Sequence, residues 1–169
     1  MVERNHDKAE GSLTLFLTDD DATEEVGSAL GLALRPGDSV MLEGDLGAGK
    51  SALARAAIRA VLAEDGRAEE IPSPTFTLVQ VYDTSRGEVW HVDLYRLSSP
   101  EEALELGLEA AFGQAISLLE WPDRLGDLAP ARRLIAHLDV PTDGVGRVLT
   151  LTPIGGDWTG ALDAAKGAM

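Results

Sequence analysis

The stretch SVMLEGDLGAGKSALARAAIRAVLA, residues 39–63, combines a short apolar run, a glycine-rich turn and a run of strong helix formers. Its centre, Gly44–Ser51, fits the pattern G-x-x-x-x-G-K-[ST] of the phosphate-binding P-loop. A true P-loop connects a strand to a helix. Val40–Leu42 predicts the strand, and Ala52–Ala63 predicts the helix. The stretch therefore predicts a nucleotide-binding domain of the α/β class.

Each residue type in this loop is suited to binding phosphate groups and their metal ion. Glycines let backbone N–H groups point inward and cradle anionic oxygens. Lys50 would place its ammonium against the β- and γ-phosphates, and the hydroxyl of Ser51 would ligate Mg²⁺. The helix that begins near Ser51 adds the positive end of its dipole. The alternative, a glycine turn without a ligand, does not explain the strand and helix on either side.

The composition is that of a globular protein, with 169 residues, 44% hydrophobic and 25% charged. We expect a disordered segment at 1–11, one P-loop domain at 12–153 and a tail at 154–169. With no cysteine, disulfides and thiolate chemistry are excluded. No apolar run approaches the length of a membrane span, so we expect a cytoplasmic protein without a membrane association.

The net charge of −15 reflects 29 acidic against 14 basic residues. Such a surface repels a phosphate backbone unless basic residues gather on one patch. Arg132 and Arg133 form the only pair of adjacent basic residues, which is more typical of a surface feature than of a nucleic-acid site. If the chain serves a nucleic-acid pathway, we therefore expect it to act through other proteins.

The segments before and after the P-loop predict further strands and helices. Leu13–Leu17 alternates as a strand does, and Thr18–Asp21 supplies N-cap chemistry for a helix over 22–34. A metal site built from the three aspartates of that cap is the less favoured interpretation. Ser98–Glu102 opens a helical packing region that ends near Gly113.

Prolines and alternating residues indicate how the sheet is built. Two prolines make Ile71–Leu78 extended and non-helical, where P-loop proteins carry their first switch. Leu78–Tyr82 and Glu88–Leu97 predict two antiparallel strands, so the sheet should be mixed. Arg132–Val140 and Arg147–Pro153 predict a closing pair.

Two carboxylates stand out on predicted strands. Glu120 follows the apolar run Ala115–Leu119, at the carboxyl edge where ligands gather in open α/β sheets and where it can hold Mg²⁺. Asp93 follows Val92 as a metal-shell or water-orienting group would. The alternatives are an ordinary strand-ending glutamate and an aspartate paired with Arg96 or another surface base. His91 is interpreted as a packed or surface histidine without a chemical role.

Four segments, in this order and spacing, resemble the TsaE (YjeE-type) family of ATPases. They are Gly44–Ser51, the SPTFTL of Ser73–Leu78, the DLYRL of Asp93–Leu97 and the LLEWP of Leu118–Pro122. The similarity spans about residues 13–152. One departure is Ser51, where threonine is common in the family, and either hydroxyl serves.

This resemblance implies a three-layer α/β/α P-loop fold with a mixed central sheet and MgATP as ligand. It also implies weak hydrolysis by an isolated monomer, and a role beside TsaB and the transferase TsaD in forming threonylcarbamoyladenosine on tRNA, without direct tRNA binding. Lys50 and Asp93 would be catalytic, and Ser51 and Glu120 would ligate Mg²⁺. The residues implied to contact the nucleotide are Asp45, Leu46, Gly47, Ala48, Gly49, Lys50, Ser51, Thr75 and Arg147, with Thr23 a weaker candidate near the base.

Two other classes of P-loop protein remain as alternatives. A small-molecule kinase needs a lid with several arginines to screen the phosphate from water, and only Arg132 and Arg133 are adjacent here. A regulatory GTPase that acts as a binding switch selects guanine with N-K-x-D. The only asparagine is Asn5, so that motif is absent.

Overall fold

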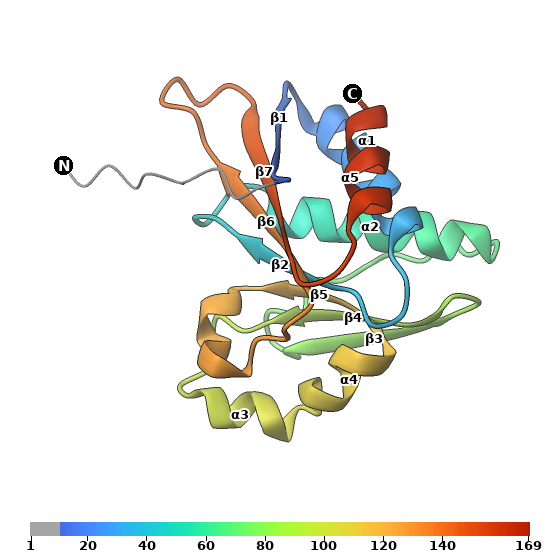
Figure 1. Ribbon diagram of the computed structural model, residues 1–169, viewed down its shortest axis with the longest axis vertical. Helices are drawn as coiled ribbons and strands as arrows, with labels where there is room; N and C mark the ends of the chain where they lie inside the picture. The colour runs from blue at the N-terminus through green and yellow to red at the C-terminus, as the bar shows by residue number, and fades with distance from the viewer. Residues whose placement is uncertain (1–10) are drawn as a thin grey trace.

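The computed structural model describes residues 11–169, so the disorder expected for the first residues falls on positions outside the described range. Over that range, seven strands form one sheet in the order β1-β7-β6-β2-β5-β4-β3 (Figure 1). Strands β6, β2, β5 and β4 are parallel, whereas β1/β7, β7/β6 and β3/β4 pair antiparallel, which confirms the expected mixed sheet. The strands are β1 (Leu13–Leu17), β2 (Ser39–Glu43), β3 (Val79–Thr84), β4 (Gly87–Asp93), β5 (Ile116–Glu120), β6 (Arg133–Asp139) and β7 (Arg147–Ile154).

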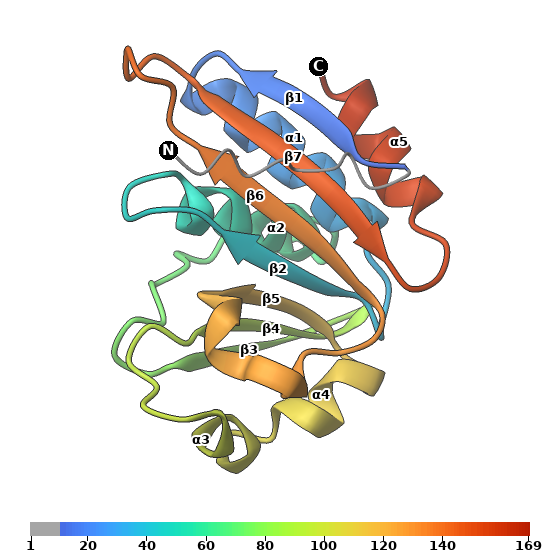
Figure 2. The same cartoon turned by 60° about the vertical axis from the view of Figure 1, so that its left-hand side comes forward.

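Helices cover both faces of this sheet and give a three-layer α/β/α arrangement (Figures 1 and 2). One layer holds α1, α2 and α5, and the other holds α3, α4 and the 3₁₀ helix η1. Their bounds are α1 (Asp20–Ala33), α2 (Lys50–Glu64), α3 (Pro100–Glu105), α4 (Leu108–Gln114), η1 (Pro122–Leu128) and α5 (Thr159–Gly167). None of these helices, within residues 11–169, has the length and apolar character of a membrane span.

The central strand β2 is buried on both faces because each face is covered by helices. Val40 and Leu42 join the apolar core beneath α1 and α2, while Met41 between them joins the core beneath α3 and η1. Side chains of a strand alternate between faces, so one apolar run serves both cores. The loop that follows β2 is thereby anchored by a strand that is held from both sides.

The second predicted hairpin strand is shorter than the sequence suggests. Strand β4 ends at Asp93, not at Leu97, because the chain then turns and the N–H of Leu97 donates to the carbonyl oxygen of Leu94 (3.1 Å). Both leucines are buried within that turn. These two leucines therefore extend the apolar sequence pattern beyond the residue at which the strand ends.

The helical region expected to end near Gly113 is divided into two short helices. Gly107 separates α3 from α4 with φ of 81°, a left-handed conformation that an α-helix cannot contain. The proline-rich segment 71–78 is non-helical as predicted but is not extended throughout. Its end is closed by a turn in which the N–H of Leu78 donates to the carbonyl oxygen of Pro74 (2.7 Å).

Residues 154–169, whose glycine- and alanine-rich sequence predicts a short helix or a loose tail, contain helix α5, which packs beside α1. Trp158, just before α5, is buried, and so are Ala161 and Ala165 within it. The indole N–H of Trp158 donates to the carbonyl oxygen of Gly155 (3.1 Å). These contacts join the end of the described chain to the core.

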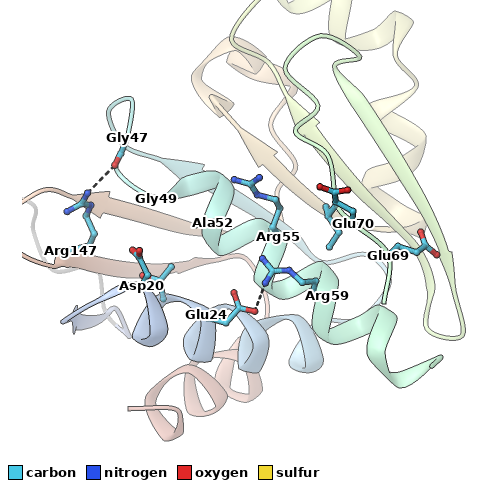
Figure 3. Close-up of a pocket in the computed structure, with 12 residues that line it drawn as sticks. Asp20, Glu24, Gly47, Gly49, Ala52, Arg55, Arg59, Glu69, Glu70 and Arg147 are labelled. Atoms are coloured by element: carbon cyan, nitrogen blue, oxygen red, sulfur yellow. Dashed lines mark hydrogen bonds and ion pairs between the residues drawn. The ribbon is translucent and has the colours of Figure 1, made fainter. Parts of the chain in front are cut away.

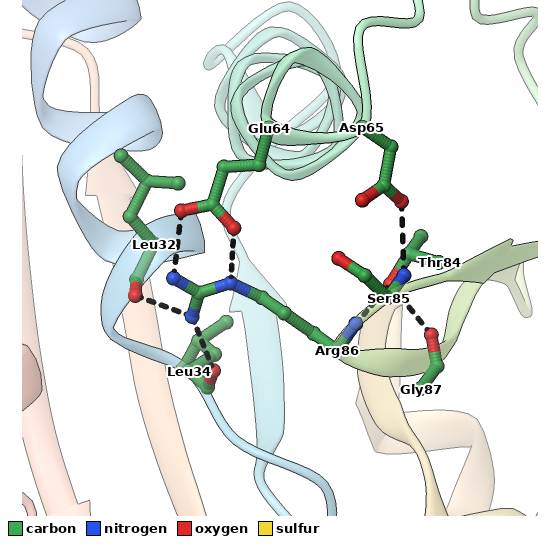
Figure 4. A network of polar contacts seen from close by, with 8 residues as sticks. All are labelled: Leu32, Leu34, Glu64, Asp65, Thr84, Ser85, Arg86 and Gly87. Atoms are coloured by element: carbon green, nitrogen blue, oxygen red, sulfur yellow. Dashed lines mark hydrogen bonds and ion pairs between the residues drawn. The ribbon is translucent and has the colours of Figure 1, made fainter.

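The turn between β3 and β4 fastens the ends of two helices (Figure 4). The guanidinium of Arg86 binds both carboxylate oxygens of Glu64, at the end of α2, at 2.6 and 2.8 Å. It also donates to the carbonyl oxygen of Leu32 in α1 (2.6 Å). One arginine thus ties α1, α2 and the hairpin together, on the side opposite the start of α2.

Candidate functional site

The loop after β2 takes backbone conformations that demand glycine at two positions. Gly44 has φ of 143°, and a Cβ there would lie 2.6 Å from the carbonyl oxygen of Leu138. Gly49 has φ of 108° and immediately precedes α2. The helix therefore begins at Lys50, with its first N–H groups and its positive dipole end directed at the loop. Such a concave loop is suited to bind an anion.

Lys50 lies within the loop, with only 4% of its surface exposed. Its ammonium donates to the carbonyl oxygens of Gly44 (2.7 Å) and Asp45 (2.9 Å) and lies 4.2 Å from the centre of the Trp121 ring. Burial lowers the pKa of Lys50, and the carboxylates of Glu120, Asp45 and Asp93 oppose that shift. The ammonium is therefore partly desolvated, and it is available to an anion that replaces the carbonyl oxygens.

Ser51 and Glu120 meet at the carboxyl edge of the sheet. The Ser51 hydroxyl donates to Oε1 of Glu120 (2.6 Å), and Oε2 of the same carboxylate lies 2.8 Å from Nε2 of His91. Burial alone would raise the pKa of Glu120, but the hydrogen bonds from His91 and Ser51 and the charge of Lys50 lower it on balance. The carboxylate is thus kept ionised beside the start of α2.

Asp93 lies next to Glu120 on the neighbouring strand. The parallel register of β4 and β5 pairs these two residues directly. Oδ1 of Asp93 accepts the N–H of Tyr95 (3.0 Å), and Oδ2 lies 3.4 Å from the hydroxyl of Thr75. The hydroxyl of Thr75 is also 2.7 Å from that of Ser73. The proline-rich segment is therefore connected to this edge through Thr75.

A cavity of about 600 Å³ opens beside the loop on the α1 side of α2 (Figure 3). Arg147 reaches the loop there and donates to the carbonyl oxygen of Gly47 (3.2 Å). Arg59 pairs with Glu24 (2.6 Å), while Arg55 donates to the carbonyl oxygen of Ser51 (3.3 Å). Within the described residues, neither Arg55 nor Arg147 pairs with a carboxylate. The residues that line the cavity are Asp20, Thr23, Glu24, Gly47, Gly49, Ala52, Arg55, Arg59, Glu69, Glu70, Ile71 and Arg147.

The sequence-predicted residues fall into two groups around the loop. One group gathers at the carboxyl ends of β4 and β5 and consists of Lys50, Ser51, Thr75, Asp93 and Glu120. Thr23 and Arg147 lie on the cavity side, where Arg147 touches Gly47. Leu46, at the tip of the loop, is 74% exposed. The interpretation that Asp93 pairs with Arg96 is not supported, because Arg96 stacks over Phe76 instead.

Two residues of this site carried no predicted role. His91 contacts Glu120, and Trp121 covers the Lys50 ammonium from a left-handed backbone conformation with φ of 59°. For His91 the sequence held a usable signal, because it lies two residues before Asp93 and therefore on the same face of the strand. The three aspartates at 19–21 are not arranged as a metal site: Asp19 caps α1 by accepting the N–H of Ala22 (2.9 Å), and Asp20 and Asp21 lie in the first turn of the helix. In residues 11–169 no group of three or more His, Cys, Asp or Glu side chains is arranged to hold a metal ion.

Comparison with known proteins gives consistent matches over most of the chain. A sequence model of the family described as "Threonylcarbamoyl adenosine biosynthesis protein TsaE" matches residues 17–147. The tRNA threonylcarbamoyladenosine biosynthesis protein TsaE of Rickettsia felis is 40% identical over 126 residues, which cover 75% of this chain and 72% of that protein. The protein of the same name from Nostoc sp. is 39% identical and covers 66% and 68%. The crystal structure of Bacillus subtilis YdiB superposes with a TM-score of 0.74 at 25% identity, over 92% of this chain and 95% of that one.

Proposed function

The chain belongs to the TsaE family, and from this premise we propose that it is a P-loop ATPase that binds and hydrolyses MgATP in support of the TsaB–TsaD machinery. That machinery forms N6-threonylcarbamoyladenosine on tRNA. One observation carries the proposal. Lys50, Ser51, Asp93 and Glu120 converge at one edge of the sheet, beside a loop shaped to receive an anion.

The side chains present fit a magnesium ion and a polyphosphate. Mg²⁺ prefers oxygen ligands and retains several waters, so two protein oxygens are a sufficient share. The hydroxyl of Ser51 and the carboxylate of Glu120, 2.6 Å apart, would supply those oxygens. When bound, Mg²⁺ would neutralise charge on the β- and γ-phosphates.

The residues of the chain would then divide the remaining work. Lys50 and the N–H groups at the start of α2 would hold the phosphates. Asp93 would accept a hydrogen bond from the attacking water and orient it toward the γ-phosphorus. A new bond would form from the water oxygen to that phosphorus, the bond to the β,γ-bridging oxygen would break as ADP leaves, and the hydrogens of the water would leave with the inorganic phosphate. Trp121 would shield Lys50 from solvent on one side.

The cavity on the α1 side supports a place for the nucleoside. It begins at Gly47 and Gly49 of the phosphate-binding loop and extends along α2. Arg147 and Thr23 line it, as the family resemblance implies for residues near the nucleotide. Arg55 adds a cation without an acidic partner among the described residues, in a chain whose net charge is −15.

Charge and exposure support a protein partner rather than tRNA as the direct contact. One residue of the basic pair at 132–133 already makes contacts within the protein, because Arg132 binds Asp38 (2.9 Å) and stacks over Trp158. Phe76, beside Thr75, is 80% exposed and available to a partner. The segment 71–78 therefore connects a partner-facing surface to Asp93, as a nucleotide-sensing switch must.

An ATPase assay with and without the TsaB–TsaD pair tests the proposal. We expect slow phosphate release by the chain alone, faster release with the pair, and no need for a phosphate acceptor. Filter binding should show no tight association with bare tRNA at physiological salt. Acceptor-dependent transfer would indicate a kinase, and tight tRNA binding with no response to the proteins would overturn the proposal.

A further inference from the structure

We propose that His91 is a positioning residue, which fixes the carboxylate of Glu120 so that its other oxygen meets Ser51. Only the expected effect on Mg²⁺ affinity rests on the proposed function. The hydrogen bond between the two side chains stands on its own geometry.

The surroundings of His91 leave its ring one polar contact. The side chain is fully buried on β4. Nε2 lies 2.8 Å from Oε2 of Glu120, while Nδ1 has no hydrogen-bond partner in the part of the chain that the structure describes. A buried imidazole without a partner is costly, so this single contact anchors the ring.

The direction of the hydrogen bond follows from the chemistry of the two groups. An ionised carboxylate can only accept, so the hydrogen must lie on Nε2 of His91. The opposite oxygen of Glu120 accepts from Ser51. Each oxygen therefore has its own donor, and the carboxylate plane is fixed from β4 on one side and α2 on the other.

Packing alone would not require a hydrogen-bond donor at position 91. A histidine that only filled space could be replaced by an apolar side chain of similar volume with little effect on the neighbouring carboxylate. Here such a replacement leaves Oε2 of Glu120 buried without a donor. Groups that orient a metal ligand typically change metal affinity by about tenfold to a hundredfold when removed.

The test compares His91→Leu, which removes the donor, with His91→Gln, whose amide N–H₂ can donate from a similar reach. Ser117→Ala is the matched control, because Ser117 is a buried polar residue of the adjacent strand β5 whose hydroxyl has no partner among the described residues. Binding of a non-hydrolysable ATP analogue is titrated against Mg²⁺, and again in EDTA. Thermal unfolding without nucleotide is followed in parallel.

We expect His91→Leu to raise the Mg²⁺ concentration for half-maximal binding about tenfold or more. His91→Gln should recover most of that loss, Ser117→Ala should match wild type, and affinity in EDTA should be equal in all four proteins. A folded His91→Leu protein with wild-type Mg²⁺ dependence overturns the proposal. So does an equal loss in His91→Gln and His91→Leu that persists in EDTA.

A second measurement uses the unmodified protein and needs no nucleotide. In a ¹⁵N-histidine NMR spectrum, His91 should show a slowly exchanging hydrogen on Nε2. A hydrogen found on Nδ1 alone overturns the proposal, even if no variant folds. If the wild-type chain binds no nucleotide at any Mg²⁺ concentration, the proposed function fails, and the NMR result still decides the role of His91.

Discussion

Asp93 and Glu120 are direct register partners at the carboxyl ends of the neighbouring parallel strands β4 and β5. The residues lie far apart in the sequence, yet the sheet brings their side chains to one edge, beside the first turn of α2. Each accepts different donors: Thr75 and the N–H of Tyr95 for Asp93, His91 and Ser51 for Glu120. Two adjacent carboxylates thereby have different hydrogen-bond surroundings.

We predict that Lys50→Ala weakens binding of MgATP without unfolding the protein. Among residues 11–169 the ammonium donates only to loop carbonyls, and a charge-assisted hydrogen bond contributes about 1.5–3 kcal/mol, or about tenfold to a hundredfold in affinity. Isothermal titration with a non-hydrolysable analogue measures the change. Lys166→Ala, at an exposed site in α5, is the control. Equal affinity in wild type and Lys50→Ala would remove the phosphate role.

We predict that Glu120→Gln and Asp93→Asn separate metal binding from turnover. Glu120→Gln should raise the Mg²⁺ requirement for nucleotide binding at least about tenfold, because a neutral amide is a poorer ligand. Asp93→Asn should leave affinity close to wild type but lower turnover about a hundredfold or more. Mg²⁺ titrations and single-turnover phosphate release measure the two effects. Asp123→Asn removes an exposed carboxylate three residues after Glu120 and serves as control. The assignment fails if Glu120→Gln behaves as wild type at limiting Mg²⁺.

The contrast between predicted and observed features of this site has a physical cause. The loop, its strand and its helix are local in sequence, so periodicity and glycine spacing predict them. The contact of His91 with Glu120 joins two strands through the sheet register, and a single sequence does not state which strands are neighbours. The sequence pattern did not predict the early end of β4 for another reason. Buried Leu94 and Leu97 continue the apolar pattern although they lie in a turn.

We predict that the Glu64–Arg86 contact stabilises the fold in a pH-dependent way. The hydrogen bond from Arg86 lowers the pKa of Glu64 below its ordinary value of 4.5. A carboxylate with a lowered pKa in the folded state adds stability above the unfolded-state pKa and loses it as the pH falls through the folded-state pKa. Glu64→Gln should therefore be less stable than wild type near pH 7, and the difference should start to shrink as the pH falls below about 4.5.

Urea unfolding at several pH values measures this difference. Asp163→Asn is the matched control, since Asp163 is an exposed carboxylate of α5. Its stability relative to wild type should change far less between pH 7 and pH 3. A difference for Glu64→Gln that stays constant down to pH 2 would show that the stabilisation does not depend on ionisation of Glu64.

The last prediction is that Thr75 couples the nucleotide site to the TsaB–TsaD pair. Its hydroxyl lies between Ser73 and Asp93, so it links the exposed proline-rich segment to the carboxylate proposed to orient water. Thr75→Val keeps the branched shape and removes the hydroxyl. Stimulation of ATP hydrolysis by the pair should be lost, while ATP affinity of the isolated chain stays near wild type. Thr77→Val makes the same change two residues away, where the hydroxyl accepts from the Gln80 amide (2.9 Å), and should leave stimulation intact. Equal stimulation of both variants would mean that the segment contacts the partner without transmitting nucleotide state, since a switch must differ in free energy between its two states.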